Sequence, residues 1–251
     1  MPEGFNSMRL ATSNPILPGP AGNCHQRARH RTEQTHIELA DRAFRLAHVD
    51  NDIALAHADS LVQQRYAWRG YQTGSDVFQR PTRQRTFAAY HDEIVIGTLT
   101  LRTDSSEGLL ADALYRDDID GYRQHHSAHC CELTRFALAP TRYSKEVFAS
   151  LFHLAFIFGR KVHQVSDVFI EVNPRHASFY QRMLGLKQVG PERTCKRVEA
   201  PAVLMHGELS YIEEQIREHG GCAYNRAKSL YPYFFSKQEA QSVMEQLSEA
   251  L

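Results

Sequence analysis

Glu132 and Arg135 are the charged residues whose surroundings most clearly suggest chemistry, because they interrupt a segment that otherwise favours a buried β-strand. A carboxylate in such a place can act as a general base or hold an ammonium group. A guanidinium can bind a carboxylate through two parallel hydrogen bonds. The alternatives are an ion pair between the two side chains and, for Arg135, a charge exposed to solvent. Residues three apart lie on opposite faces of a regular strand, so the ion pair would require a β-bulge.

A second cluster of reactive residue types comprises His125, His126, His129, Cys130 and Cys131. Two histidines four residues apart share a helix face, which is a zinc-binding spacing. No Cys-x-x-Cys pair accompanies them, and adjacent cysteines point to opposite sides of an extended chain. We therefore expect no metal site here. Cys195 likewise has no evident neighbouring base that would make it a covalent nucleophile.

The composition excludes several classes of protein. The 251 residues include 29 Lys and Arg and 29 Asp and Glu, a balance that argues against a general nucleic-acid-binding protein. No apolar run reaches the roughly 20 residues that span a bilayer, so we expect no transmembrane segment. Prolines interrupt the hydrophobic residues near the N-terminus, which argues against an export signal. Five cysteines without a disulfide-framework spacing indicate reduced thiols, and we expect a cytoplasmic protein.

Composition and periodicity divide the chain into three regions. Residues 1–31 are rich in Pro, Gly, Ser and Asn and lack periodicity, which is typical of a disordered tail. In residues 32–209, predicted strands alternate with predicted helices, which indicates one α/β (α+β) domain around a mixed sheet. Residues 210–251 are predicted to form a C-terminal helical extension. The expected strands are 43–49 (at a sheet edge), 84–90, 94–101, 132–138, 165–172, 186–189 and 202–208.

Capping signals define the ends of two later helices. Pro174 suits the first position of a helix and Gly185 suits its C′ position, with Asn173 just ahead as the N-cap. Ser236 and Glu239 have the spacing of a capping box at the start of the last helix. A strongly apolar helix is also expected over residues 144–162.

Two stretches of the sequence resemble known families. The run VNPRHASFYQRMLGL, from Val172 to Leu186, resembles the late strand–helix motif of the GNAT acyltransferase superfamily. The longer region 86–209 resembles the N-acyl amino acid synthases, a bacterial branch of that superfamily. The pieces that carry this second resemblance are Ile96–Leu101, Glu132–Ala137 and Cys195–Met205. The Glu132-x-x-Arg135-Phe136 pattern is also similar to that of the acyl-homoserine-lactone synthases.

The resemblance implies a GNAT-like central sheet and a reaction. Enzymes of this kind move a long fatty acyl group from acyl carrier protein to the α-amine of an amino acid, and they need no resident cofactor. By this resemblance Tyr180 is the proton donor near the thioester sulfur, with a core tyrosine as the alternative. Glu132 is then the expected base, while Arg135, Phe136 and Asn173 are expected to bind substrate.

The turn over residues 139–146 bears on the acyl donor. Typical GNAT enzymes carry a glycine-rich turn here, whose backbone amides wrap the pyrophosphate of coenzyme A, whereas this turn has no glycine. A carrier-protein phosphopantetheine presents only one phosphate, so we expect acyl carrier protein rather than coenzyme A. Carrier proteins are acidic, and a basic rim would attract them. The residues expected to form that rim are Arg142, Lys145, Arg160, Lys161, Arg175 and Arg182.

Two other functions compete with this one. An acyl-homoserine-lactone synthase would need S-adenosylmethionine, and the segment Ala67–Arg80 shows no clear match to that family's Trp and Asp pattern. A non-catalytic module could instead capture acyl carrier protein or a fatty acyl group. The acceptor amino acid, the acyl chain length and the oligomeric state are left open. The C-terminal helices could form a lid, a dimer contact or a membrane-surface patch for the acyl product.

Overall fold

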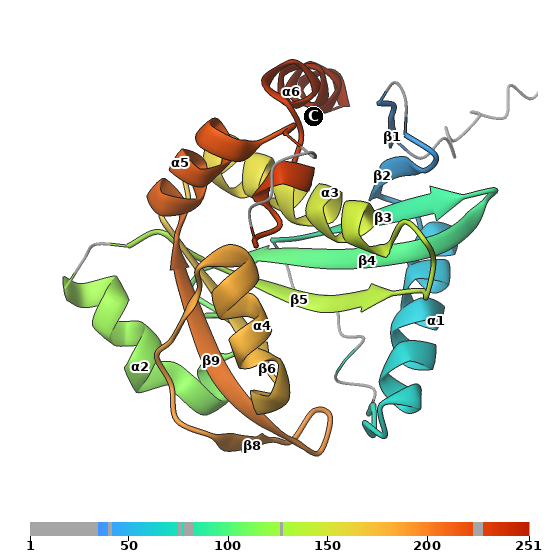
Figure 1. Ribbon diagram of the computed structural model, residues 1–251. Coiled ribbons are helices and arrows are strands. Elements are labelled where there is room, and N and C mark those ends of the chain that lie inside the picture. Colours follow the sequence, from blue (N-terminus) through green and yellow to red (C-terminus); the bar gives the residue numbers. More distant parts are fainter. Residues whose placement is uncertain are drawn as a thin grey trace, which may run out of the picture. The chain divides into compact units, whose positions relative to one another are not determined.

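A mixed nine-stranded sheet forms the centre of the protein in the computed structural model, which describes residues 35–39, 42–74, 77, 83–125, 128–222 and 228–250 (Figure 1). The strand order is β1-β2-β3-β4-β5-β6-β9-β7, and β8 pairs with β9. Only the β5–β6 pair is parallel. The strands are β1 Thr35–Ile37, β2 Arg45–Val49, β3 Gln84–His91, β4 Ile94–Thr103, β5 Cys130–Leu138, β6 Asp167–Val172, β7 Lys187–Gln188, β8 Arg193–Cys195 and β9 Ala200–Glu208.

Six α-helices cover the sheet. They are α1 Asp52–Trp68, α2 Asp112–His125, α3 Ser144–Ile157, α4 Pro174–Leu184, α5 Leu209–His219 and α6 Lys237–Ala250. A π-helical turn, Phe158–Val162, extends α3, and a short 3₁₀ helix, Tyr231–Tyr233, precedes α6. No helix among the described residues is both long and apolar enough to cross a membrane.

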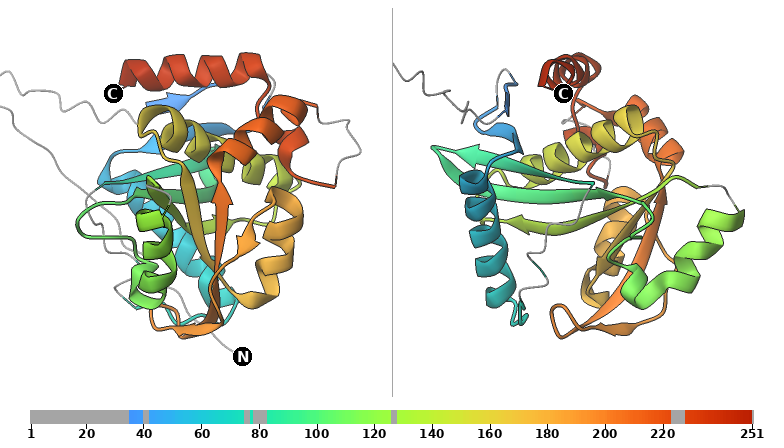
Figure 2. Two further views of the ribbon diagram at one scale, coloured as in Figure 1. Left: turned by 90° about the vertical axis from the view of Figure 1, so that its left-hand side faces the viewer. Right: turned by 180° about the vertical axis from the view of Figure 1, so that it is seen from behind.

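The two faces of the sheet have separate cores because strand residues alternate. On β3, Phe87 and Ala89 belong to the cluster that packs against α3, while Ala88 and Tyr90 belong to the cluster that packs against α1. Figure 2 shows α3 and α1 on opposite sides of these strands. The sequence pattern therefore fixes which helix lies on which face.

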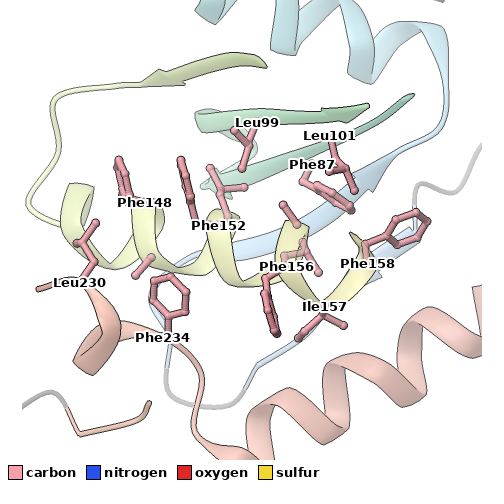
Figure 3. Packing of buried hydrophobic residues seen from close by; sticks show 14 of the residues in the cluster. Phe87, Leu99, Leu101, Phe148, Phe152, Phe156, Ile157, Phe158, Leu230 and Phe234 are labelled. Atoms are coloured by element: carbon pink, nitrogen blue, oxygen red, sulfur yellow. The ribbon is translucent and has the colours of Figure 1, made fainter. Parts of the chain in front are cut away.

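Helix α3 is buried on all sides, which explains its apolar sequence. Every residue from Val147 to Ile157 is buried. One side of the helix faces the sheet through Phe152, and Figure 3 shows Leu230 and Phe234 of the C-terminal segment on the other side. The His153 Nδ1 atom accepts a hydrogen bond of 2.8 Å from the backbone N–H of Phe235. The C-terminal segment thus completes the core around α3.

The central feature of the sheet is the gap that opens between β5 and β6. The two strands pair only from Cys130 to Glu132 and then diverge. Beyond that point β5 contains a bulge, since Thr134 pairs with Thr100 but Ala137 pairs with Thr98. Arg135 lies inside the bulge with a φ of 53°, a conformation that few non-glycine residues adopt. Because β6 stays paired with β9, the gap widens toward the carboxyl ends of β5 and β6.

Most predicted elements are present, with several corrections. The strand expected at the sheet edge is β2, but β1 pairs with it and takes the edge. The short strand β8 was not predicted, and the apolar helix ends at Ile157 and continues as a π-turn. Asn173 and Gly185 cap α4 as expected, and Ser236 and Glu239 form the capping box. The tail over residues 1–31 lies outside the described residues.

Candidate active site

Two adjoining cavities fill the gap between β5 and β6. The larger has a volume of about 320 Å³ and the smaller about 120 Å³. Eight residues line both cavities, so the two form one continuous space. These shared residues are Tyr66, Tyr71, Leu133, Thr134, Arg135, Glu171, Val172 and Asn173. A pair of substrates could therefore meet here from two sides.

The larger cavity lies on the side of α3 and α4 and is mainly aromatic. Phe136 from the bulge packs edge-on against Phe148 and Phe152 of α3, with ring centroids 4.7 and 5.3 Å apart. Tyr180 of α4 lines the same cavity, together with His176 and Arg69. Burial raises the pKa of Tyr180, so its hydroxyl stays protonated at neutral pH and remains able to donate. The structure thus brings together the predicted residues Phe136, Tyr180 and Asn173.

The smaller cavity contains an ion pair that sequence reasoning missed. Glu171, near the end of β6, accepts a hydrogen bond of 2.9 Å from Arg197 in the β8–β9 connection. The two side chains are 11% and 23% exposed, so the pair is partly shielded from water yet open to the cavity. Burial alone would lower the pKa of Arg197, but its interactions with Glu171 and Cys195 are stronger, so the pKa of Arg197 is raised. A carboxylate inside an otherwise apolar strand was the available signal, as it was for Glu132.

Cys195 lies beside this pair and lines the smaller cavity. Burial and the neighbouring Glu171 raise the pKa of the Cys195 thiol. A protonated thiol is a weak nucleophile, so its surroundings match the expectation that this residue does not react covalently.

Arg135 reaches a partner different from the one considered at first. The bulge directs its guanidinium to Asp59 of α1, with which it forms an ion pair, and not to Glu132. The Arg135 side chain is buried, with 5% of its surface exposed, although the residue also lines both cavities. Burial lowers the pKa of Arg135 from its usual value. The alternative of a solvent-facing charge is therefore wrong.

Glu132 lies in the paired part of β5, and neither cavity includes it among its lining residues. Its two carboxylate oxygens accept hydrogen bonds from the backbone N–H groups of Leu110 and Ala111, at 2.6 and 3.0 Å. Burial raises the pKa of Glu132 to about 7, although these two hydrogen bonds work in the opposite direction. The side chain holds the segment that leads into α2, and Leu110 of that segment lines the smaller cavity. This geometry suits a positioning residue better than a base.

In the turn between β5 and α3, three backbone amides donate hydrogen bonds within the turn itself. The N–H of Thr141 donates to Ser144 Oγ, the N–H of Tyr143 to Thr141 Oγ1, and the N–H of Ser144 to the Thr141 carbonyl. These distances are 3.1, 3.2 and 3.3 Å. These three amides are therefore engaged within the turn, which has no glycine.

The six basic residues expected around the donor entry do not form one group. Arg142 and Lys145 lie at the N-terminal end of α3, where Arg142 hydrogen-bonds the Tyr143 hydroxyl. Arg160 and Lys161 follow the other end of α3, and both bind Glu213 of α5. Two residues belong to α4: Arg175 is in its first turn against Tyr71, and Arg182 in its last turn bonds the Ser178 carbonyl.

The histidine and cysteine cluster offers no metal centre in the part of the chain that the structure describes. No group of three or more His, Cys, Asp or Glu side chains there could hold an ion. His126 lies outside the described residues. Cys130 and Cys131 are buried, and burial raises the pKa of both thiols.

Comparison with known proteins identifies the family. The model of the family described as N-acyl amino acid synthase FeeM matches residues 57–208. This range includes β5, β6, most of α1 and all of α2 to α4. The chain belongs to the FeeM N-acyl amino acid synthase family. A search of curated proteins finds no match.

The chain is also similar to several solved structures, and the first of them supports the fold. The chain is similar to FeeM, an N-acyl amino acid synthase from uncultured soil microbes, with 22% identity and a TM-score of 0.62 over 68% of this chain and 93% of that one. It is also similar to an aminoglycoside N(6′)-acetyltransferase from Legionella pneumophila, with 14% identity, a TM-score of 0.48 and coverage of 69% and 96%. A third similar structure is an N-acetyltransferase from Staphylococcus aureus, with 11% identity, a TM-score of 0.46 and coverage of 67% of this chain and 99% of that one.

The predicted family and the predicted GNAT-like fold are thus confirmed. In this fold the gap between β5 and β6 holds the two adjoining cavities. The chain is an N-acyltransferase.

Proposed function

We propose that the protein transfers a long-chain fatty acyl group from an acyl carrier protein thioester to the α-amine of an amino acid. The observation that carries this proposal is the Glu171–Arg197 ion pair in the smaller cavity, next to the aromatic donor cavity. A free amino acid carries an ammonium and a carboxylate on neighbouring atoms. A carboxylate and a guanidinium 2.9 Å apart are complementary to that zwitterion.

In this mechanism Glu171 holds the ammonium group and accepts one of its protons, which frees the amine for attack. Arg197 binds the acceptor carboxylate through its planar fork. Both groups start as a pair, so neither charge is left uncompensated in the cavity before the acceptor binds. We therefore assign the role of base to Glu171 and that of positioning residue to Glu132.

The donor side supplies the remaining groups. Arg135 and Phe136 lie in the bulge of β5 and line the larger cavity, where the thioester carbonyl would lie. The amine attacks the carbonyl carbon, the C–S bond breaks, and Tyr180 donates its proton to the leaving thiolate. The proton taken by Glu171 then returns to solvent, and Tyr180 regains one from water.

Two features support a carrier-bound long-chain donor. The amides of Thr141, Tyr143 and Ser144 are engaged within the glycine-free turn, which favours the single phosphate of a carrier protein over a pyrophosphate. An apolar cavity of about 30 Å³ adjoins the larger one, and Leu133, Phe152 and Ile170 line both. Its other walls come from α3, β6 and α5. A fatty acyl chain would bury most of its apolar surface in the larger cavity of about 320 Å³, and the small cavity could take only the end of the chain.

Acceptor selectivity tests the proposal. Wild-type protein should acylate amino acids but not the matching amines that lack a carboxylate. Arg197→Lys should raise the KM for the amino acid, because a lysine cannot form the two parallel hydrogen bonds. Glu171→Gln should lower kcat by roughly 100-fold, the lower end of the effect of a general base. Glu192→Gln, at an exposed carboxylate, is the control. Equal rates with amines and amino acids would contradict the proposal.

A further inference from the structure

The C-terminal end of α1 exposes a tryptophan between two arginines. Trp68 is 73% exposed, although large aromatic side chains normally bury most of their surface. The Arg65 guanidinium lies 4.6 Å from the centre of its ring and that of Arg69 lies 5.9 Å away. Trp68 is the one tryptophan of the whole sequence. Nothing in the fold accounts for its position.

This patch continues into the mouth of the donor cavity. Arg69 and His176 both line the larger cavity. Arg175, in the first turn of α4, donates a hydrogen bond of 3.2 Å to the Tyr71 hydroxyl, and Tyr71 lines the cavity as well. Burial lowers the pKa of His176, and the nearby positive charges of Arg175 and Arg69 lower it further. This is consistent with a positive potential at the mouth of the cavity.

The arginines of the patch differ from many of the arginines that the structure describes. Arg42, Arg123, Arg135, Arg160, Arg193 and Arg197 each form an ion pair with a carboxylate. Among the described residues, Arg65, Arg69 and Arg175 form no ion pair with a carboxylate. Their charge is thus available to a partner. Tryptophan and arginine are also the residue types that dominate the binding energy of protein interfaces.

We infer that Arg65, Trp68, Arg69 and Arg175 form the docking surface for the acidic protein that delivers the acyl-phosphopantetheine arm. Acidic side chains of the carrier pair with the arginines, its apolar contact residues cover Trp68, and the arm passes between α1 and α4 into the larger cavity. This inference rests on the proposed carrier-bound donor. It replaces the expected rim of six basic residues by a surface that shares only Arg175 with it.

The test uses Trp68 itself as the probe. Titration of the full-length protein with a tryptophan-free, acyl-loaded carrier protein should shift the emission of Trp68 to shorter wavelength and reach saturation. Because surface charge pairs are screened by salt, binding should weaken strongly at high ionic strength. Arg65→Glu should weaken binding by roughly tenfold, whereas Arg116→Glu, at an exposed arginine of α2, should have little effect.

Kinetics separate docking from chemistry. Trp68→Ala and Arg65→Glu should each raise the KM for the carrier-bound thioester by roughly tenfold and leave the rate with a small acyl-pantetheine thioester unchanged. If wild-type protein uses the carrier and both variants keep its KM, the docking surface is overturned while the proposed function stands. If wild-type protein uses the small thioester but not the carrier, the proposed donor fails and the surface with it. A Trp68 shift with anionic lipid vesicles and none with the carrier would assign the patch to a membrane instead.

Discussion

Two carboxylates on neighbouring strands, the buried Glu132 on β5 and the half-buried Glu171 on β6, lie in different surroundings. Glu132 accepts two backbone hydrogen bonds in a closed environment, whereas Glu171 is paired with a guanidinium in an open cavity. Both lie within predicted strands, but the sequence pattern pointed to Glu132 alone. Their different surroundings follow from the point at which β5 and β6 separate. Glu132 lies where the two strands still pair, whereas Glu171 lies where they have diverged.

The raised pKa of the buried Glu132 predicts how the free energy of unfolding depends on pH. Its pKa is about 7 in the folded protein against 4.5 for an ordinary glutamate, so between these values the folded state binds more protons than the unfolded state. The free energy of unfolding should therefore fall as the pH rises from about 4.5 to about 7. In Glu132→Gln this dependence is removed. Between pH 5 and 7.5, wild type should therefore lose roughly 2 kcal/mol of unfolding free energy relative to the variant.

Urea unfolding of both proteins at the two pH values measures this shift. Glu192→Gln, which removes an exposed carboxylate, should show no comparable change. A constant difference between wild type and Glu132→Gln across this range would mean that Glu132 is ionised in the folded protein throughout.

At the scale of elements, the length of the acyl chain should depend on the apolar cavity between α3, β6 and α5. Ala155 of α3 lines this cavity and is buried at 2% exposure. Ala155→Phe would fill the space, so activity with long-chain donors should fall by at least roughly tenfold, while short-chain donors lose much less. Competition between donors of two chain lengths, read out by mass spectrometry, gives the ratio directly. Ala149→Phe, also buried in α3 but not part of the cavity wall, controls for overpacking.

Elements with strong local signals were predictable from the sequence. Helix α4 has an N-cap at Asn173, a proline in its first turn and a left-handed residue at Gly185. Both ends of the helix lie where these residues predict them. Strands β1 and β8 have only three residues each and gain their stability from β2 and β9, so no local pattern could indicate them. The π-turn after α3 likewise follows from packing, not from a breaking residue.

The candidate site was predictable only in part, for a related reason. Tyr180, Phe136 and Asn173 follow from a sequence resemblance and do meet in one cavity. The partner of Arg135 depends on the bulge, which directs the side chain to Asp59 of a distant helix. Arg197 belongs to the β8–β9 connection, and its encounter with Glu171 depends on a pairing far apart in the sequence. Such contacts are properties of the tertiary structure, so strand and helix patterns do not reveal them.

At the scale of the whole molecule, the proposed mechanism places the two substrates on the two sides of the split sheet. In it, the cavity beside α3 and α4 would receive the donor, the cavity near β8 and β9 would receive the acceptor, and the two cavities join at Glu171 and Asn173. Glu33–Leu251 forms one compact unit, in which the C-terminal segment closes the core over α3. The central claim is the identity of the product.

Mass spectrometry of lipid extracts tests that claim most directly. Bacteria that express the wild-type protein should contain N-acyl amino acids with long acyl chains, and these should disappear with Glu171→Gln while Glu192→Gln retains them. The product masses would identify both the acceptor and the chain length. Soluble, folded wild-type protein that yields no N-acyl amino acid, or a Glu171→Gln variant that yields as much as wild type, would contradict the account.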